Sequence, residues 1–184
     1  MIKDKNVLLG VTGGIAAYKA ASLASLLVKA GAAVNVIMTK EAQNFIGAAT
    51  FEALTHRRVH DDVFDRADPS RVHHIALAQE ADLLVIAPAT ANVIAKMAHG
   101  LADDLLTATL LATRAPVTVA PAMNDGMWAH PATQANLDAL RSRGVTVVEP
   151  DAGALACGTD GKGRLAAIEK ICSTVRSLRP QMHG

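Results

Sequence analysis

The chain has 184 residues, of which 51% are hydrophobic and only 3% aromatic, so it is long enough for one domain with an aliphatic core. Its formal net charge of +1 comes from intermixed acidic and basic residues, and no basic run indicates a nucleic-acid-binding protein. No apolar run approaches the roughly 18 residues of a membrane helix, and the first residues lack the apolar core and cleavage site of a signal peptide.

Short apolar runs alternate along the chain with stretches of helical periodicity. The apolar runs predict strands at Asn6–Val11, Ala33–Met38, Asp82–Pro88, Pro116–Ala120 and Val145–Pro150. The periodic stretches predict helices at Ile15–Ala30, Asn92–His99, Asp104–Ala112, Pro131–Arg143 and Ala166–Leu178. This alternation predicts an α/β protein with a Rossmann-like (flavodoxin-like) doubly wound parallel sheet in a three-layer α/β/α arrangement. We expect a single domain over residues 1–184, with its core at 5–178 and a tail at 179–184.

Small and hydroxyl residues follow the predicted strands, at the edge where doubly wound sheets bind their ligands. Gly13 and Gly14 follow the first strand, and Thr39 follows the second. Thr90 lies just after the third strand, and Asn124 lies just after the fourth. These four strand ends together predict a ligand site at the carboxyl edge of the sheet.

The glycine turn and the two threonines each allow two interpretations. The turn at Gly13 and Gly14 is neither a dinucleotide fingerprint nor a P-loop, yet it could present a helix N-terminus to a phosphate. It could equally be a tight turn that requires glycine. Thr39 and Thr90 could bind phosphate or cap the following helix. Taken together with the glycines, the threonines favour a mononucleotide phosphate site.

The segment after the fourth strand carries an amide side chain close in sequence to sulfur and indole side chains. Asn124 could satisfy the backbone of a turn or bind a substrate carboxylate. Met123, Met127 and Trp128, the only tryptophan in the chain, could fill the core or contact a flat cofactor ring.

Histidine and cysteine supply further candidates. His74, next to His73, could be a general base or an exposed helix residue. The glycine-rich stretch 155–164 has no periodicity and reads as a loop that closes over a ligand, with Cys157 in it. Cys172 is expected to pack in the last helix. Two cysteines make neither a disulfide framework nor a metal motif, which favours a reducing, cytoplasmic setting without a metal.

Five motifs carry a resemblance to a known family. They are GGIAAYK, the pair His74-Ile75, APATAN, PAMNDGMW and ACGTDGKGR, spread from Val7 to Arg164. With these motifs in this order, the chain resembles the homo-oligomeric flavin-containing cysteine decarboxylases. That family includes phosphopantothenoylcysteine decarboxylase of coenzyme A synthesis and enzymes that act on the C-terminal cysteine of ribosomal peptides.

The resemblance implies FMN as cofactor and a role for each matching residue. FMN would contact Gly13, Gly14, Ile15, Thr39, Thr90, Ala91, Asn92 and Ala122. His74 would be the catalytic base, Asn124 would hold the substrate carboxylate with Met127 nearby, and Cys157 would be the acid on the closing loop. The implied reaction oxidises the cysteine side chain to a thioaldehyde, after which CO₂ leaves and an enethiol forms. The coenzyme A branch then reduces the enethiol, whereas the peptide branch stops there.

Departures from the coenzyme A pattern bear on the substrate. Ala76 and Gln79 stand where glutamate and a basic residue are common, and the loop reads GKGRL instead of GPGRM. The chain also ends after this domain, whereas a synthetase domain follows in most bacterial coenzyme A enzymes. These features lead us to expect a peptide with a C-terminal cysteine slightly ahead of phosphopantothenoylcysteine, although the retained Cys157 favours the latter.

The resemblance also implies partners and leaves other function classes open. The family forms trimers, often assembled into dodecamers, with FMN at the subunit interface. A non-catalytic FMN-binding regulatory subunit is a second class, but such proteins usually carry long acidic extensions that this chain lacks. A prenyl-flavin synthase on a similar fold would not be expected to carry the PAMNDGMW motif. Neither nucleic acid nor a membrane is expected as a partner.

Overall fold

The computed structural model describes residues 2–64, 72–154, 158 and 160–178. Its centre is a six-stranded sheet in which every neighbouring pair is parallel. The strands are β1 (Asn6–Val11), β2 (Ala33–Met38), β3 (Val59–His60), β4 (Leu83–Ala89), β5 (Val117–Pro121) and β6 (Thr146–Val147). Their order, β3-β2-β1-β4-β5-β6, is that of the Rossmann fold and confirms the doubly wound sheet.

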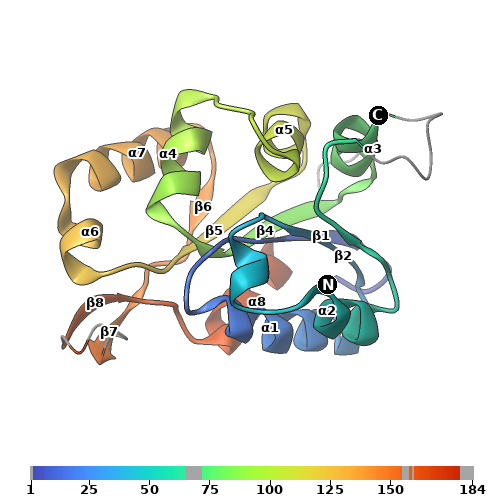
Figure 1. Ribbon diagram of the computed structural model, residues 1–184, viewed down its shortest axis with the longest axis horizontal. Helices are drawn as coiled ribbons and strands as arrows, with labels where there is room; N and C mark the ends of the chain where they lie inside the picture. The colour runs from blue at the N-terminus through green and yellow to red at the C-terminus, as the bar shows by residue number, and fades with distance from the viewer. Residues whose placement is uncertain (1, 65–71, 155–157, 159, 179–184) are drawn as a thin grey trace.

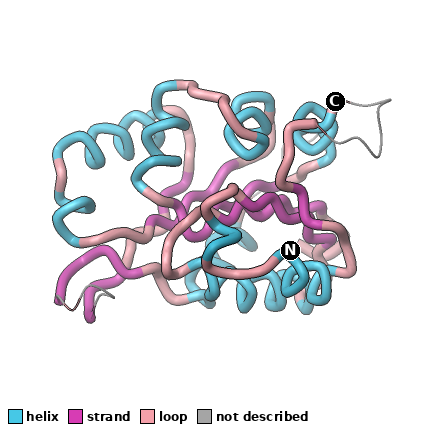
Figure 2. The backbone as a smooth tube through the Cα atoms, in the orientation of Figure 1, coloured by secondary structure: helices cyan, strands magenta, loops and turns pink. Residues whose placement is uncertain are grey.

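Helices cover both faces of the sheet (Figure 1). One face carries α1 (Ala17–Lys29), α2 (Ala48–Thr55) and α8 (Ile168–Ser177). The other carries α3 (His73–Glu80), α4 (Ala91–His99), α5 (Leu105–Ala112) and α7 (Pro131–Ser142). Figure 2 shows the strands running between these two layers, which confirms the three-layer α/β/α arrangement. No helix in the described ranges is long and apolar enough to cross a membrane.

The core divides into two apolar clusters, one on each face of the sheet. Alternate residues of the central strands supply both: Leu9 and Val85 face the α1 side, and Leu8 and Leu84 face the α4 side. All seven residues of β4 are buried, as expected for a central parallel strand that is covered on both faces.

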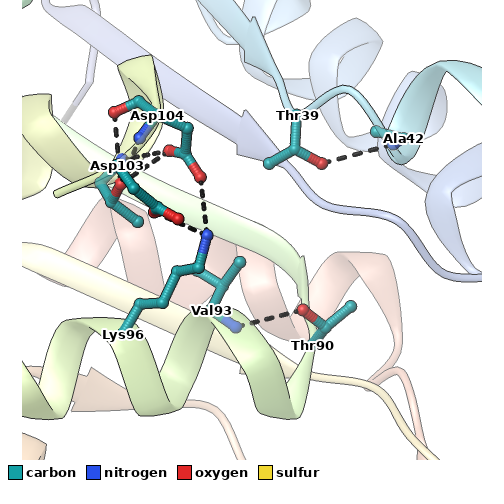
Figure 3. Close-up of polar contacts among 8 residues, drawn as sticks. Thr39, Ala42, Thr90, Val93, Lys96, Asp103 and Asp104 are labelled. Atoms are coloured by element: carbon teal, nitrogen blue, oxygen red, sulfur yellow. Dashed lines mark hydrogen bonds and ion pairs between the residues drawn. The ribbon is translucent and has the colours of Figure 1, made fainter. Parts of the chain in front are cut away.

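An ion cluster helps to fix the α4 layer. Lys96 on α4 contacts Asp103 at 2.7 Å just before α5, and this hydrogen bond raises the pKa of the lysine (Figure 3).

The structure contains all five predicted strands and corrects several details. Strand β6 is shorter than the predicted Val145–Pro150, because this edge strand pairs only with β5 and its ladder covers two residues. The prediction missed the strand β3 and the helices α2, α3 and α6 (Asp125–Ala129), which are only two, eight, eight and five residues long. It also missed a 3₁₀ turn at Ala42–Asn44.

The glycine-rich stretch is not wholly irregular. Residues Asp160–Arg164 form strand β8, which pairs antiparallel with β7 (Asp151–Ala154) as a hairpin outside the main sheet. Extended glycines permit the pairing, but with few side chains they leave no alternation in the sequence to signal a strand. Figure 1 places this hairpin beside α6, at the end of the molecule farthest from α3. The predicted tail at 179–184 and Cys157 lie outside the described residues.

Candidate functional site

A cavity of about 610 Å³ opens at the carboxyl edge of the sheet. It lies beyond the ends of β1 and β4, the adjacent strands at which the chain order reverses, and this is the ligand position expected in doubly wound sheets. Three segments build its walls: the turn into α1, the strand ends that lead into α4 and α6, and the β7–β8 hairpin. The lining residues are Gly13, Gly14, Ile15, Ala16, Tyr18, Lys19, Thr90, Ala91, Ala122, Met123, Asn124, Met127, Ala154, Gly163, Arg164 and Leu165.

A buried threonine joins the two strand ends beneath the cavity. The Thr12 hydroxyl donates to the carbonyl oxygen of Pro88 at 2.7 Å and accepts the backbone N–H of Thr90 at 3.1 Å. Thr12 is completely buried, so these bonds replace water for three polar groups. The sequence prediction overlooked Thr12, although a hydroxyl residue directly after a buried strand was a usable signal.

The two predicted phosphate-binding threonines both bond to backbone (Figure 3). The Thr90 hydroxyl accepts the N–H of Val93 at 3.3 Å and so caps α4, and Thr90 also lines the cavity. The Thr39 hydroxyl accepts the N–H of Ala42 at 3.3 Å, and Thr39 is buried away from the cavity lining. Asn92 is exposed and does not belong to the lining either. The structure therefore brings Thr90 into the cavity and leaves Thr39 and Asn92 outside it.

The two glycines of the first turn differ in what surrounds them. A Cβ atom on Gly13 would lie 2.3 Å from the Cβ of Glu41 and 2.9 Å from its carbonyl carbon, so this position admits only glycine. Within the described ranges, a Cβ on Gly14 would meet Thr90 Cγ2 alone, at 3.8 Å. The turn leads into α1, and no side chain among the described residues caps this helix. Helix N-termini of this kind attract anions, and this one adjoins the cavity.

Asn124 caps the short helix α6 and lines the cavity at the same time. Its Oδ1 accepts the backbone N–H groups of Gly126 at 2.9 Å and Met127 at 3.3 Å, and its Nδ2 donates to Asp125 at 2.9 Å. The Asn124 side chain is exposed at the cavity. Met127 also lines the cavity, whereas Trp128 is buried in the core on the α4 side.

The β7–β8 hairpin forms the remaining wall. Ala154 and Arg164 line the cavity from the two strands, together with Gly163. Gly163 has a φ of +154°, and a Cβ there would lie 2.2 Å from the carbonyl oxygen of Met123. The Gly163 carbonyl accepts the N–H of Met123 at 2.9 Å, which ties the hairpin to the segment that leads into α6. Sequence reasoning did not single out Arg164 or Lys19, the two cations of the lining.

The family described as Flavoprotein matches residues 1–179. The chain belongs to the flavoprotein family. The coenzyme A biosynthesis bifunctional protein CoaBC of Bacillus subtilis is 53% identical to this flavoprotein over 171 residues, which is 93% of this chain and 42% of the relative. The chain thus spans less than half the length of this curated relative.

Two solved structures resemble the flavoprotein over nearly their whole length. One is a mutant PPC decarboxylase complexed with pantothenoylaminoethenethiol, with a TM-score of 0.83, 35% identity, and coverage of 95% of this chain and 97% of that one. The other is the FMN-dependent cysteine decarboxylase SpaF, with a TM-score of 0.83, 37% identity and the same coverage.

His74 does not lie among the residues that line the cavity. It is in the first turn of α3, at the opposite end of the molecule from the hairpin (Figure 1). Its Nδ1 atom is buried and has no hydrogen-bond partner within the part of the chain that the structure describes. The predicted base is therefore remote from the predicted carboxylate-binding amide of the same flavoprotein chain.

Proposed function

We propose that this flavoprotein binds FMN in the cavity at the end of β1 and β4 and decarboxylates the cysteine moiety of its substrate. The observation that carries this proposal is the convergence in one cavity of the Gly13–Gly14 turn, Thr90 and Asn124. The 53% identity to the Bacillus subtilis coenzyme A protein supports the same reaction, as does the near-complete match to a PPC decarboxylase and to the FMN-dependent cysteine decarboxylase SpaF.

The cavity fits a flavin mononucleotide in size and chemistry. About 610 Å³ lies within the range of small-molecule sites, and its lining is mostly apolar with a few polar groups. The uncapped start of α1 suits the phosphate, and Gly14 leaves open the space that a Cβ would fill. Bound FMN would supply the redox chemistry that allows a cysteine carboxylate to leave as CO₂. We assign its contacts to Gly13, Gly14, Ile15, Thr90, Ala91 and Ala122.

Asn124 is proposed to orient the substrate carboxylate. Its two capping bonds fix the rotamer of the side chain, so the amide is held in one orientation before the substrate arrives. The nitrogen of an amide side chain carries two N–H donors. In Asn124 this nitrogen, Nδ2, donates to the Asp125 carboxylate at 2.9 Å. A carboxylate bound here would lie next to Met127, which also lines the cavity.

Phosphopantothenoylcysteine is the substrate that the observations favour. Lys19 and Arg164 line the cavity, and neither forms a salt bridge within the described ranges, so both can receive an anionic group such as a phosphate. The higher identity to the coenzyme A protein points the same way. A peptide with a C-terminal cysteine is the second candidate, supported by the 37% identity to SpaF.

His74 is proposed to act on the cavity of another copy in a homo-oligomer, with a trimer as the smallest assembly. Its own cavity does not include it, and α3 lies at the far end of the chain from the hairpin. Exposed apolar side chains flank both places: Val72 and Ile75 surround His74, and Ile15 and Tyr18 stand at the cavity. Joining these two surfaces would bury them and bring the histidine to the substrate.

The decisive experiment offers two substrates to the purified protein. We expect a flavin absorbance spectrum, and we expect mass spectrometry to show that phosphopantothenoylcysteine loses CO₂ alone to give 4′-phosphopantetheine. Loss of CO₂ and two hydrogens from a peptide that ends in cysteine, with the small substrate unchanged, would replace the first candidate by the second. A protein without flavin and without turnover on either substrate would overturn the proposal.

A further inference from the structure

The position of the β7–β8 hairpin sets the shape of the cavity. Ala154, Gly163 and Arg164 of the hairpin form one of the walls, yet the hairpin pairs with no strand of the main sheet. The position of the hairpin therefore depends on side-chain contacts and on the backbone hydrogen bond between Met123 and Gly163. The residues that fix the hairpin against α6 control how Arg164 is presented to a ligand.

Lys162 makes two contacts away from the hairpin. Its Nζ lies 2.8 Å from the carboxylate of Glu149 and 5.2 Å from the centroid of the Trp128 ring. The first is a salt bridge and the second is a cation–π contact, which is strongest with tryptophan. The ammonium group thus links β8 to two other segments. Glu149 lies in the connection between β6 and β7, and Trp128 lies in helix α6.

Both partners of Lys162 are themselves held in place. Trp128 is 8% exposed and packs in the core on the α4 side. Glu149 also pairs with Arg141 of α7, which in turn contacts Asp138 at 2.9 Å. Burial raises the pKa of Glu149, but Lys162 and Arg141 outweigh it and lower the pKa below its ordinary value. Lys162 therefore joins β8 to a fixed ring and a fixed, ionised carboxylate.

The backbone next to Lys162 shows why this anchor matters to the cavity. The β7–β8 register shifts at this point: Asp151 pairs with Arg164, and Ala152 pairs with Lys162, so Gly163 is an extra residue. A bulge of this kind re-aims the neighbouring side chains. Here Lys162 contacts α6 on one side of the bulge, and Arg164 lines the cavity on the other side.

We propose that Lys162 is a positioning residue that holds the β7–β8 hairpin against α6 and Glu149 and thereby keeps Arg164 in the ligand cavity. Its effect on substrate binding rests on the proposed function, but its effect on the hairpin does not. Lys162 is half exposed, so its substitution leaves the core intact.

Trp128 is the only tryptophan in the chain, so its fluorescence reports on the docking of the hairpin. We expect Lys162→Met to raise acrylamide quenching of Trp128 and to speed hydrogen exchange at the amides of 160–164 about fivefold, because the hairpin opens more often. Lys162→Arg keeps the cation and should restore both values. Lys29→Met is the matched control, because Lys29 is an exposed lysine in the last turn of α1 and is not a partner of Glu149 or of the indole.

Kinetics supply the second readout. We expect Lys162→Met to raise the KM for phosphopantothenoylcysteine about fivefold with kcat within about twofold of the parent, since the residue acts on binding and touches no reacting atom. Quenching and exchange that stay unchanged in Lys162→Met, or that change equally in Lys29→Met, would overturn the inference. A parent protein that turns over neither substrate would overturn the proposed function instead, and the fluorescence and exchange measurements would still decide the role of Lys162.

Discussion

The two sides of the cavity are built in different ways. On the sheet side, the buried Thr12 hydroxyl fixes the ends of β1 and β4. The lining residues directly after these two strands, Gly13, Gly14, Thr90 and Ala91, are small. On the hairpin side, the wall stands outside the sheet and is held by the Gly163–Met123 bond and by half-exposed charges. The sheet side is suited to a permanently bound group, and the hairpin side is suited to a ligand that enters and leaves.

This difference predicts which substitutions affect cofactor and which affect substrate. A defect on the sheet side should act through the stability of the fold and the retention of flavin. A defect on the hairpin side should leave flavin in place and reduce turnover. The following substitutions test that separation, beginning with the largest expected effect.

Gly163→Ala should damage the hairpin side most. The residue has a φ of +154°, and an added Cβ would lie 2.2 Å from the Met123 carbonyl oxygen, so the hairpin must move away from its present position. We expect kcat/KM to fall about hundredfold or more, as for other displacements of about 1 Å at a site, with flavin content retained. Turnover and flavin absorbance are measured on the same sample. Gly47→Ala is the control, because no atom of the residues that the structure describes lies within 4 Å of its Cβ position. Loss of flavin from Gly163→Ala would contradict the separation.

Asn124→Asp separates capping from substrate binding. Aspartate keeps the acceptor oxygen for the N–H groups of Gly126 and Met127, so α6 should remain capped. It lacks the amide donors and would repel a substrate carboxylate, so we expect turnover to fall about hundredfold. The variant also loses the donor to Asp125 and sets two carboxylates side by side, so we expect the free energy of unfolding in urea to fall by about 1 kcal/mol. A variant that unfolds more easily but retains turnover would show that Asn124 serves only the helix.

Thr12→Val tests the sheet side. Valine removes the hydroxyl that donates to Pro88 and accepts from Thr90, and two buried backbone groups lose their partner. We expect the free energy of unfolding to fall by about 2 kcal/mol, measured by urea denaturation. Thr118→Val is the matched control, because the hydroxyl of this buried strand residue has no partner within the described residues. Its loss should change stability by less than about 0.5 kcal/mol. Equal losses in the two variants would argue against the Thr12 bonds as the cause.

The sequence predicted the parts of this site that depend on one segment at a time. The continuous apolar run of β4 predicted a central strand, and the small residues that follow β1 and β4 predicted the position of the cavity. Local sequence could not show that Asn124 faces the cavity while Trp128, four residues later, faces the core. That depends on how the short helix α6 packs on its neighbours.

Contacts between distant segments were beyond prediction for the same reason. Lys19 and Arg164 are far apart in the chain and come together only because the hairpin closes over the start of α1. The remoteness of His74 from the cavity likewise follows from the path of α3, which packs against α5. The positions of these residues depend on how the helices and the hairpin pack together. The sequence predicted some of these elements one by one and missed the others, but it did not predict their packing.

The smallest expected effect is a pH dependence confined to the hairpin side. The folded pKa of Glu149 lies below its ordinary value of 4.5, so its ion pair stabilises the docked hairpin above that value and is lost as the pH falls through the lower folded pKa. Because the pair is half exposed, we expect less than about 1 kcal/mol. Acrylamide quenching of Trp128 should be constant from about pH 8 to about pH 5 and rise only in stronger acid. In Glu149→Gln, acrylamide quenching of Trp128 should already be higher at neutral pH and should not rise further in acid. If the quenching of Trp128 instead begins to rise near neutral pH, a histidine and not Glu149 controls the docking of the hairpin.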